Sequence, residues 1–346
     1  MHPVEPYSTP TRIPHLPDGS IWINTPSKAG IEDLHGRVLL IDIWDYTCIN
    51  CLRTLPYLRE WHQRYEQLDF LIIGVHTPEF PFARDPENVR RATQRLGIRW
   101  PIVLDNDQSI WTSFANRYWP TKYLADPKGY LRYRHAGEGG YPQFEAAIQE
   151  LLREKHPDIE MPNIMPPVRP SDERGAVCLP TTPELQADSL GNPIEGYIQG
   201  RVHDFTLPDG IQPGKFYLEG TWEAVPHGHR LRGESGRILL EYEAARCNAV
   251  MGASSDATSG ADPITVVIEQ DGGPLPPERF GTDVLRSHED TLVRVDFPRL
   301  YALVDQPEVQ RHKLSLEVRA PGLIFYAFSF ESCASVQKSP QSTLEV

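Results

Sequence analysis

The sequence lacks the features that would direct it to a membrane or to a nucleic acid. No stretch approaches the roughly 18–20 consecutive apolar residues of a membrane span, and residues 1–6 lack the basic start and apolar core of a signal peptide. No block of Lys and Arg occurs, and 34 basic against 47 acidic residues give a formal net charge of -13. This charge disfavours phosphate backbones and anionic lipids as partners. We therefore expect a cytoplasmic protein with no membrane span and no nucleic-acid partner.

Cysteine is also scarce, and its distribution limits the chemistry. Of the five cysteines, Cys48 and Cys51 form a Cys-X-X-Cys pair, whereas Cys178, Cys247 and Cys333 are scattered singly. A structural zinc site needs a second pair of ligands, which the sequence does not offer. The sequence therefore predicts neither a metal site nor a cofactor. A reducing cytoplasm would leave the three single cysteines as thiols.

The cysteine pair lies at a predicted junction of strand and helix. Residues 39–43 form a short apolar run broken only by Asp42, which is typical of a central parallel strand. Beyond the cysteines, apolar residues recur at the helical spacing of three and four: Leu52, Leu55, Leu58, Trp61, Tyr65 and Leu68. Cys48 is therefore expected at a helix N-terminus, where free N–H groups and the helix dipole stabilise a thiolate.

The spacing of the two cysteines suits thiol–disulfide exchange. About one helical turn separates them, so their sulfurs can form a disulfide without movement of the backbone. Cys48 would attack an outside disulfide, and Cys51 would resolve the mixed disulfide. Asp42 lies six residues before Cys48, where its carboxyl could take the proton from Cys51. A satisfied, purely structural carboxyl is the alternative interpretation of Asp42.

Two prolines complete the pattern. Pro56 lies five residues after Cys51, inside the predicted helix, where a proline is expected to introduce a kink. Far along the chain, Trp119-Pro120-Thr121 opens a predicted strand at residues 122–125. A proline at the mouth of a strand is a candidate for a cis peptide bond, and an ordinary edge proline is the alternative.

Together these residues resemble the thioredoxin superfamily, and the segment between the second and third strands resembles its TlpA/redoxin (AhpC/TSA-like) branch. The motif DYTCINCLRTLPYL is similar to the C-terminal part of DipZ-type thiol:disulfide proteins. The resemblance implies that Cys48 is the nucleophile and Cys51 the resolving thiol. It implies that Asp42 is the buried acid and Pro120 the cis-proline that faces the cysteines. The residues that it implies for substrate binding are Trp44, Trp119 and Thr121.

The order of the predicted elements indicates an α/β thioredoxin-like domain over residues 1–155. After an irregular, proline-rich arm at residues 1–17, strands are expected at residues 39–43, 70–75, 102–105, 122–125 and 130–134, and helices at residues 52–68, 86–96, 110–118 and 143–154. Residues 156–195 are rich in proline and predict a linker. Cys178 lies in this linker, either as a bystander or as an accessory thiol that exchanges with Cys51.

The remainder of the chain predicts an all-β jelly-roll sandwich domain over residues 196–335. Strands follow one another without a helical period, for example at residues 237–242, 264–268, 292–295, 313–318 and 323–328. The region resembles, more loosely, the second domain of DipZ-type proteins, which is similar to carbohydrate-binding modules. Four aromatic residues are either core residues or platforms for sugars: Trp222, Tyr217, Tyr301 and Tyr326. Four acidic residues are interpreted as a solvated surface rather than calcium ligands: Asp262, Glu269, Asp271 and Asp283.

These observations predict a thiol–disulfide oxidoreductase that acts on a protein or small-molecule disulfide, with an unidentified reductant or oxidant as its partner. A redoxin-type thiol peroxidase is the first alternative, although the motif Pro-X-X-X-Thr-X-X-Cys is absent from the sequence. The second alternative is a protein whose β-sandwich binds a glycan or a partner while the cysteines are regulatory. Because DipZ-type proteins hold this region outside the membrane, a chain with a truncated start would be extracytoplasmic.

Overall fold

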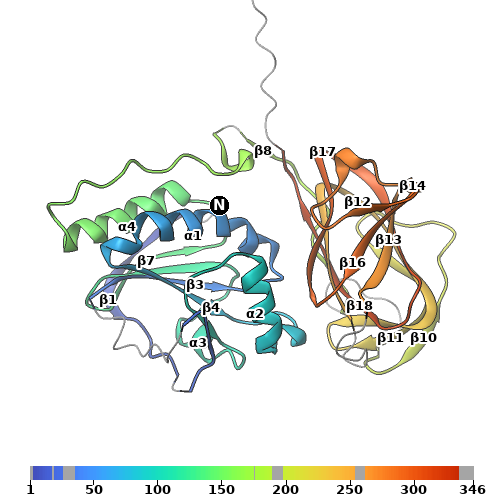
Figure 1. The fold of residues 1–346 in the computed structure, drawn as a ribbon, viewed down its shortest axis with the longest axis horizontal. Coiled ribbons are helices and arrows are strands. Elements are labelled where there is room, and N and C mark those ends of the chain that lie inside the picture. The colour runs from blue at the N-terminus through green and yellow to red at the C-terminus, as the bar shows by residue number, and fades with distance from the viewer. Residues whose placement is uncertain are drawn as a thin grey trace, which may run out of the picture. The chain divides into compact units, whose positions relative to one another are not determined.

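In a computed structural model of the chain, the described residues are 3–17, 19–25, 36–174, 176–188, 198–253 and 262–334. The chain divides into two compact units, Met1–Val168 and Arg169–Val346. Figure 1 shows helices and a sheet in the first unit and strands almost alone in the second. The predicted fold class, an α/β thioredoxin-like domain followed by an all-β domain, is therefore confirmed.

A seven-stranded mixed sheet is the framework of the first unit. Its strand order is β1-β7-β6-β3-β4-β5-β2. The strands are β1 (Glu5–Arg12), β2 (Trp22–Ile23), β3 (Val38–Trp44), β4 (Phe70–His76), β5 (Ile102–Leu104), β6 (Thr121–Ala125) and β7 (Tyr130–Ala136). The central strand β3 pairs parallel with β4 and antiparallel with β6. Every residue of β3 is buried, as expected for a strand that is covered on both faces.

Among the described residues of this unit, four α-helices accompany the sheet: α1 (Ile49–Tyr65), α2 (Pro86–Arg95), α3 (Ser109–Ser113) and α4 (Tyr141–Lys155). Figure 1 shows α1 and α4 side by side over one face of the sheet. The apolar face of α1 is buried, and the ring of its Trp61 stacks on Phe144 of α4 with centroids 5.5 Å apart. The apolar residues whose helical spacing predicted α1 thus form its buried face. Burial of this face holds α1 in the fold, and it thereby positions Cys48 and Cys51.

The N-terminal segment differs from its prediction. Residues 1–17 were expected to be irregular because of their prolines, but Glu5–Arg12 form β1 and pair antiparallel with β7. β1 is the last strand on its side of the sheet. An edge strand tolerates proline because one row of its backbone groups needs no partner strand.

The segment predicted as a linker is divided between the two units, the first of which ends at Val168. The buried carboxylate of Glu145 accepts a hydrogen bond from the Met165 backbone N–H at 2.9 Å, and the Val168 N–H donates to the Tyr57 hydroxyl at 3.1 Å. Further on, Leu185 of β9 (Leu185–Gln186) is part of the core of the second unit. Both polar and apolar contacts with residues distant in the sequence hold this segment, and its own composition does not reveal them.

The second unit is organised by a ten-stranded sheet. Its main strand order is β10-β11-β12-β17-β13-β16-β15, with β14, β18 and β9 attached to it. Its other strands are β10 (Val202–Phe205), β11 (Phe216–Val225), β12 (Gly228–Ala253), β13 (Ile264–Gln270), β14 (Gly273–Pro274), β15 (Leu285–Ser287), β16 (Asp290–Val295), β17 (Arg299–Val318) and β18 (Leu323–Glu331). Each of the five strands named from the sequence lies within one of these elements.

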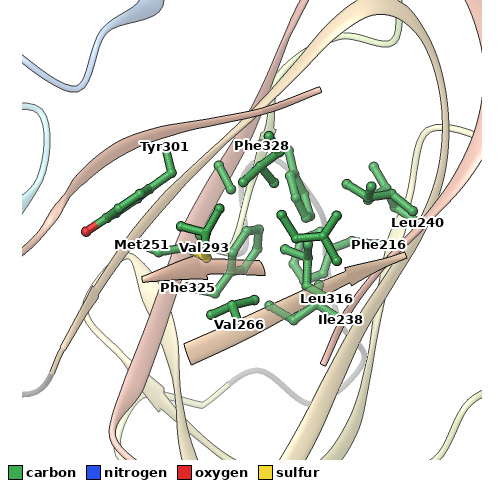
Figure 2. Close-up of a cluster of buried hydrophobic side chains, with 14 of the residues drawn as sticks. Phe216, Ile238, Leu240, Met251, Val266, Val293, Tyr301, Leu316, Phe325 and Phe328 are labelled. Atoms are coloured by element: carbon green, nitrogen blue, oxygen red, sulfur yellow. The ribbon is translucent and has the colours of Figure 1, made fainter. Parts of the chain in front are cut away.

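Aliphatic and aromatic side chains together form the core of this second unit. Figure 2 shows Phe216, Phe325 and Phe328 together among buried aliphatic side chains, and the ring centroids of Phe325 and Phe328 are 4.6 Å apart. Three of the four aromatic residues considered as sugar platforms are buried, and their rings cannot stack on a ligand at the surface: Trp222, Tyr301 and Tyr326. Trp222 and Tyr301 belong to the hydrophobic core of this unit.

Candidate active site

Cys48 and Cys51 lie where β3 leads into α1, as the sequence predicts. Cys48 is the N-cap of α1, and its sulfur accepts a hydrogen bond from the Cys51 backbone N–H at 3.2 Å. Both residues are free thiols. Cys48 is half-buried, whereas Cys51 is only 1% exposed. Of the two sulfurs, that of Cys48 is the one open to an incoming disulfide.

The surroundings of Cys51 keep its thiol protonated. Burial raises the pKa of Cys51 well above its ordinary value, and the neighbouring Cys48 sulfur and Asp42 carboxylate raise it further. A hydrogen bond with the backbone of Asp45 opposes this shift. A base close to Cys51 is therefore needed before this sulfur can attack anything.

Asp42 is a buried carboxyl with a lysine beside it. Asp42 of β3 and Lys122 of β6 are register partners, and each is 1% exposed. Asp42 Oδ1 and Lys122 Nζ are 3.6 Å apart, and neither atom has a hydrogen-bond partner among the described residues. Burial raises the pKa of Asp42, and the positive charge of Lys122 opposes that rise. Lys122 was not predicted as a site residue, although a lysine in an otherwise apolar strand, two residues after Pro120, is unusual enough to indicate a buried partner.

We expect Lys122→Met to slow the step in which Cys51 resolves a mixed disulfide, by about tenfold at pH 7. Without the lysine charge the pKa of Asp42 rises further, so more of the carboxyl is protonated at a given pH and cannot accept a proton. The rate at which Cys51 resolves the mixed disulfide should increase with pH, and in Lys122→Met this increase should occur at higher pH than in the parent. The measurement is the lifetime of the Cys48–glutathione adduct after mixing with glutathione disulfide. Lys128→Met, at an exposed turn, is the matched control, and equal pH profiles for the two variants would contradict the role of Lys122.

Asp45 fixes the turn that carries Cys48. Its side chain is fully buried, and Oδ1 accepts hydrogen bonds from the backbone N–H and the hydroxyl of Thr47, each at 2.7 Å. Oδ2 accepts the Glu79 backbone N–H at 2.7 Å, which links the turn to the loop after β4. Nε2 of the buried His76 lies 3.9 Å from the same oxygen, and burial lowers the pKa of His76. Neither Asp45 nor His76 was predicted as a site residue from the sequence.

Pro120 stands beside this turn. The peptide bond between Trp119 and Pro120 is cis, as predicted. Ile43 and Thr121 are register partners in the antiparallel β3–β6 pair, so Pro120 lies at the end of β6 next to the end of β3 that leads to Cys48. The Trp119 indole N–H donates to the carbonyl oxygen of Thr77 at 3.1 Å, which ties the proline loop to the loop after β4.

The residues expected to bind substrate differ in their accessibility. Trp44 is 1% exposed, and Thr121 is fully buried with its hydroxyl donating to the Tyr118 carbonyl oxygen at 2.8 Å. A substrate at the surface cannot touch either side chain, so neither side chain belongs to the proposed site. Trp119 is half-buried against Trp111, with ring centroids 4.2 Å apart, and Tyr118 beside it is 50% exposed. Trp119 therefore remains a candidate, and Tyr118 joins it.

The single cysteines differ from one another. Cys247 is a free, fully buried thiol, and burial raises its pKa. Cys178 was expected to be a thiol, but it is disulfide-bonded, so that prediction is wrong. The side chain of Cys333 lies outside the described residues.

Neither a metal cluster nor a membrane helix is found within the described ranges. No group of three or more His, Cys, Asp and Glu residues there could hold a metal ion. No helix there is long and apolar enough to cross a bilayer.

Two family models match the chain, one in each unit. Residues 15–148 match the family described as Redoxin. Residues 185–330 match the family described as Thioredoxin like C-terminal domain. The first match contains both cysteines of the pair, Asp42 and Pro120.

One known protein is similar to most of this chain, and others are similar to about two fifths of it. Protein DipZ of Mycobacterium tuberculosis (strain CDC 1551 / Oshkosh) is 33% identical over 281 residues, which cover 77% of this chain and 39% of DipZ. The chain thus spans well under half the length of this relative. Thiol-disulfide oxidoreductase YkuV of Bacillus subtilis (strain 168) is 29% identical over 144 residues, which cover 41% of this chain and 95% of YkuV. A solution structure of a thioredoxin-like protein in the oxidized form is 27% identical, with a TM-score of 0.39, and covers 42% of this chain and 97% of that one.

Proposed function

Because this chain is a member of the thioredoxin superfamily in its redoxin branch, we propose that it is a thiol–disulfide oxidoreductase that works through Cys48 and Cys51. One observation carries the proposal: a half-buried cysteine caps α1 while a second, fully buried cysteine donates its backbone N–H to the first sulfur. This arrangement supports opposite roles for the two thiols. The name of the relative YkuV is consistent with the same chemistry.

Cys48 is the attacking thiol in this proposal. The Cys51 N–H and the positive end of the α1 dipole both stabilise negative charge on the Cys48 sulfur. The thiolate attacks one sulfur of an outside disulfide, a mixed disulfide forms, and the other substrate sulfur leaves as a thiolate.

Cys51 then resolves the mixed disulfide. Its thiol gives up its proton to the Asp42 carboxylate, and its sulfur attacks the Cys48 sulfur. The products are a Cys48–Cys51 disulfide and a reduced substrate. Lys122 favours the ionised form of Asp42 through its charge, so it acts on this step by positioning and electrostatics.

We propose that the substrate approaches over the loop that precedes Pro120. An extended segment of a protein disulfide would pair with the backbone at Trp119 in the manner of an added strand. The exposed ring of Tyr118 and the half-buried ring of Trp119 offer an apolar surface next to it. Small-molecule disulfides would use the same sulfur without this surface.

The partner that renews the cysteine pair is a reductant or an oxidant, and the reduction potential of the pair decides between them. We expect one two-electron couple in the peptide that contains Cys48 and Cys51 when the full chain is titrated in glutathione buffers and alkylated for mass spectrometry. A potential near about −270 mV would indicate a reductant, and one near about −120 mV an oxidant.

Cys247→Ser is the control, because this buried thiol should leave the titration unchanged. A peptide that stays reduced at every glutathione ratio would reject the proposed function. Peroxide turnover with a sulfenic acid on Cys48 would instead support the thiol peroxidase.

The disulfide at Cys178 is informative about the cellular compartment in which the protein works. Disulfides form and persist in oxidising compartments and are rare in the cytoplasm, where thiols are kept reduced. We therefore propose that the protein works outside the cytoplasm, in place of the cytoplasmic location expected from the sequence.

A further inference from the structure

Cys178 forms a second sulfur site, in the unit that lacks the Cys-X-X-Cys pair. Cys178 is disulfide-bonded and exposed. It lies on β8 (Val177–Cys178), which pairs antiparallel with β19 (Cys333–Ala334), and the backbone of Cys333 stands opposite that of Cys178. These two strands form a sheet of their own, apart from the ten-stranded sheet.

This environment favours exchange of the disulfide. Exposed disulfides are more readily reduced than buried ones, because a thiolate can approach in line with the S–S bond. Two strands of two residues each add little pairing energy, so opening them costs little. The free thiol of Cys247 differs from this site, because it is fully buried and burial raises its pKa. It is therefore not accessible for exchange with another cysteine.

We propose that the Cys178 disulfide is a substrate of the Cys48–Cys51 pair of this same protein. The proposal rests on the thiol–disulfide exchange proposed above. The protein supplies both reactants, because the cysteine pair is a dithiol while Cys178 is oxidised.

The exchange balances without a further reactant. The Cys48 thiolate attacks the Cys178 sulfur, a Cys48–Cys178 bond forms, and the cysteine previously bonded to Cys178 leaves as a thiolate. Cys51 gives a proton to Asp42 and attacks the Cys48 sulfur, which releases Cys178 as a thiolate. Two electrons have then moved from the cysteine pair to the second site, and both released thiolates take up protons.

The position of β8 and β19 gives this exchange a consequence. β8 lies near the beginning of the all-β unit, and β19 follows β18, which in chain order is the last strand of the ten-stranded sheet. Reduction removes the covalent tie between β8 and the segment bonded to it. The redox state of Cys48 and Cys51 would thereby decide whether β8 is covalently bonded to the rest of the all-β unit.

The test uses the full chain with Cys51→Ser, which cannot resolve mixed disulfides. After incubation at pH 8, alkylation and digestion without reductant, we expect mass spectrometry to detect a Cys48–Cys178 linked peptide. Covalent dimers on non-reducing gels identify exchange between two copies, and a linked monomer identifies exchange within one chain. In the chain with all five cysteines, we expect limiting dithiothreitol to open the Cys178 disulfide at least tenfold faster than in Cys48→Ser.

The controls separate this inference from the proposed function. Cys51→Ser combined with Cys247→Ser should still form the linked peptide, and Cys48→Ser combined with Cys51→Ser should not. If Cys51→Ser forms covalent complexes with insulin but no Cys48–Cys178 peptide, the Cys178 disulfide is structural only and the inference is overturned. If it forms neither, the proposed function fails as well.

Discussion

Replacing Cys48 by serine should lower the rate of insulin disulfide reduction by at least about a thousandfold. A serine hydroxyl is not ionised near neutral pH, so it cannot replace a thiolate as the attacking group. The buried Cys51 cannot take over, because its thiol is 1% exposed and burial raises its pKa. The assay is the turbidity of insulin with dithiothreitol as the reductant.

A loss of structure should not explain this result. Serine is among the best N-cap residues, so Cys48→Ser keeps a hydrogen-bond acceptor at the start of α1. We expect an unchanged far-ultraviolet circular dichroism spectrum and a melting temperature within about 2 °C of the parent. Cys247→Ser should reduce insulin at the parent rate. Activity that persists in Cys48→Ser would show that these two cysteines do not carry the reaction.

The parts of the site that sequence reasoning predicted depend on local patterns. The apolar run of β3, the helical period of α1 and the two-residue gap between the cysteines all lie within thirty residues of one another. Each pattern has a direct structural meaning, so Cys48 at the helix start and Cys51 about one turn further along follow from these patterns. The cis peptide bond before Pro120 was predicted from a distant motif of the same kind.

The missed residues depend on contacts that local patterns do not encode. Lys122 meets Asp42 only through the register of β6 against β3. Asp45 accepts a hydrogen bond from the backbone of Glu79, 34 residues away. In the sequence, it looks like one of the many aspartates that lie in solvated turns before a helix. The pairing of β8 with β19 joins Cys178 to a strand 155 positions later. Such contacts follow from the three-dimensional arrangement and not from spacing along the chain.

Asp45→Ala should destabilise the first unit by about 3–5 kcal/mol. The buried Asp45 carboxylate accepts three hydrogen bonds. In the alanine variant, the backbone N–H and hydroxyl of Thr47 and the backbone N–H of Glu79 would lose their acceptor. Each buried donor left unpaired costs about 1–3 kcal/mol, which partial access of water reduces. The turn before Cys48 would loosen, so the rate of insulin reduction should fall as well. Asp45→Asn, which keeps the shape but presents an amide N–H₂ to one of the donors, should lie between alanine and the parent.

The chain contains a matched control for this substitution. Asp107 makes the same local pair of bonds, since its Oδ1 accepts the backbone N–H and the hydroxyl of Ser109 at 3.1 and 2.7 Å, but Asp107 is exposed. Asp107→Ala should therefore cost no more than about 1 kcal/mol. Six of the seven tryptophans precede residue 169, so tryptophan fluorescence during urea unfolding reports mainly on the first unit. If Asp45→Ala and Asp107→Ala shift the unfolding midpoint equally, burial of the Asp45 carboxylate is not what holds the turn that carries Cys48.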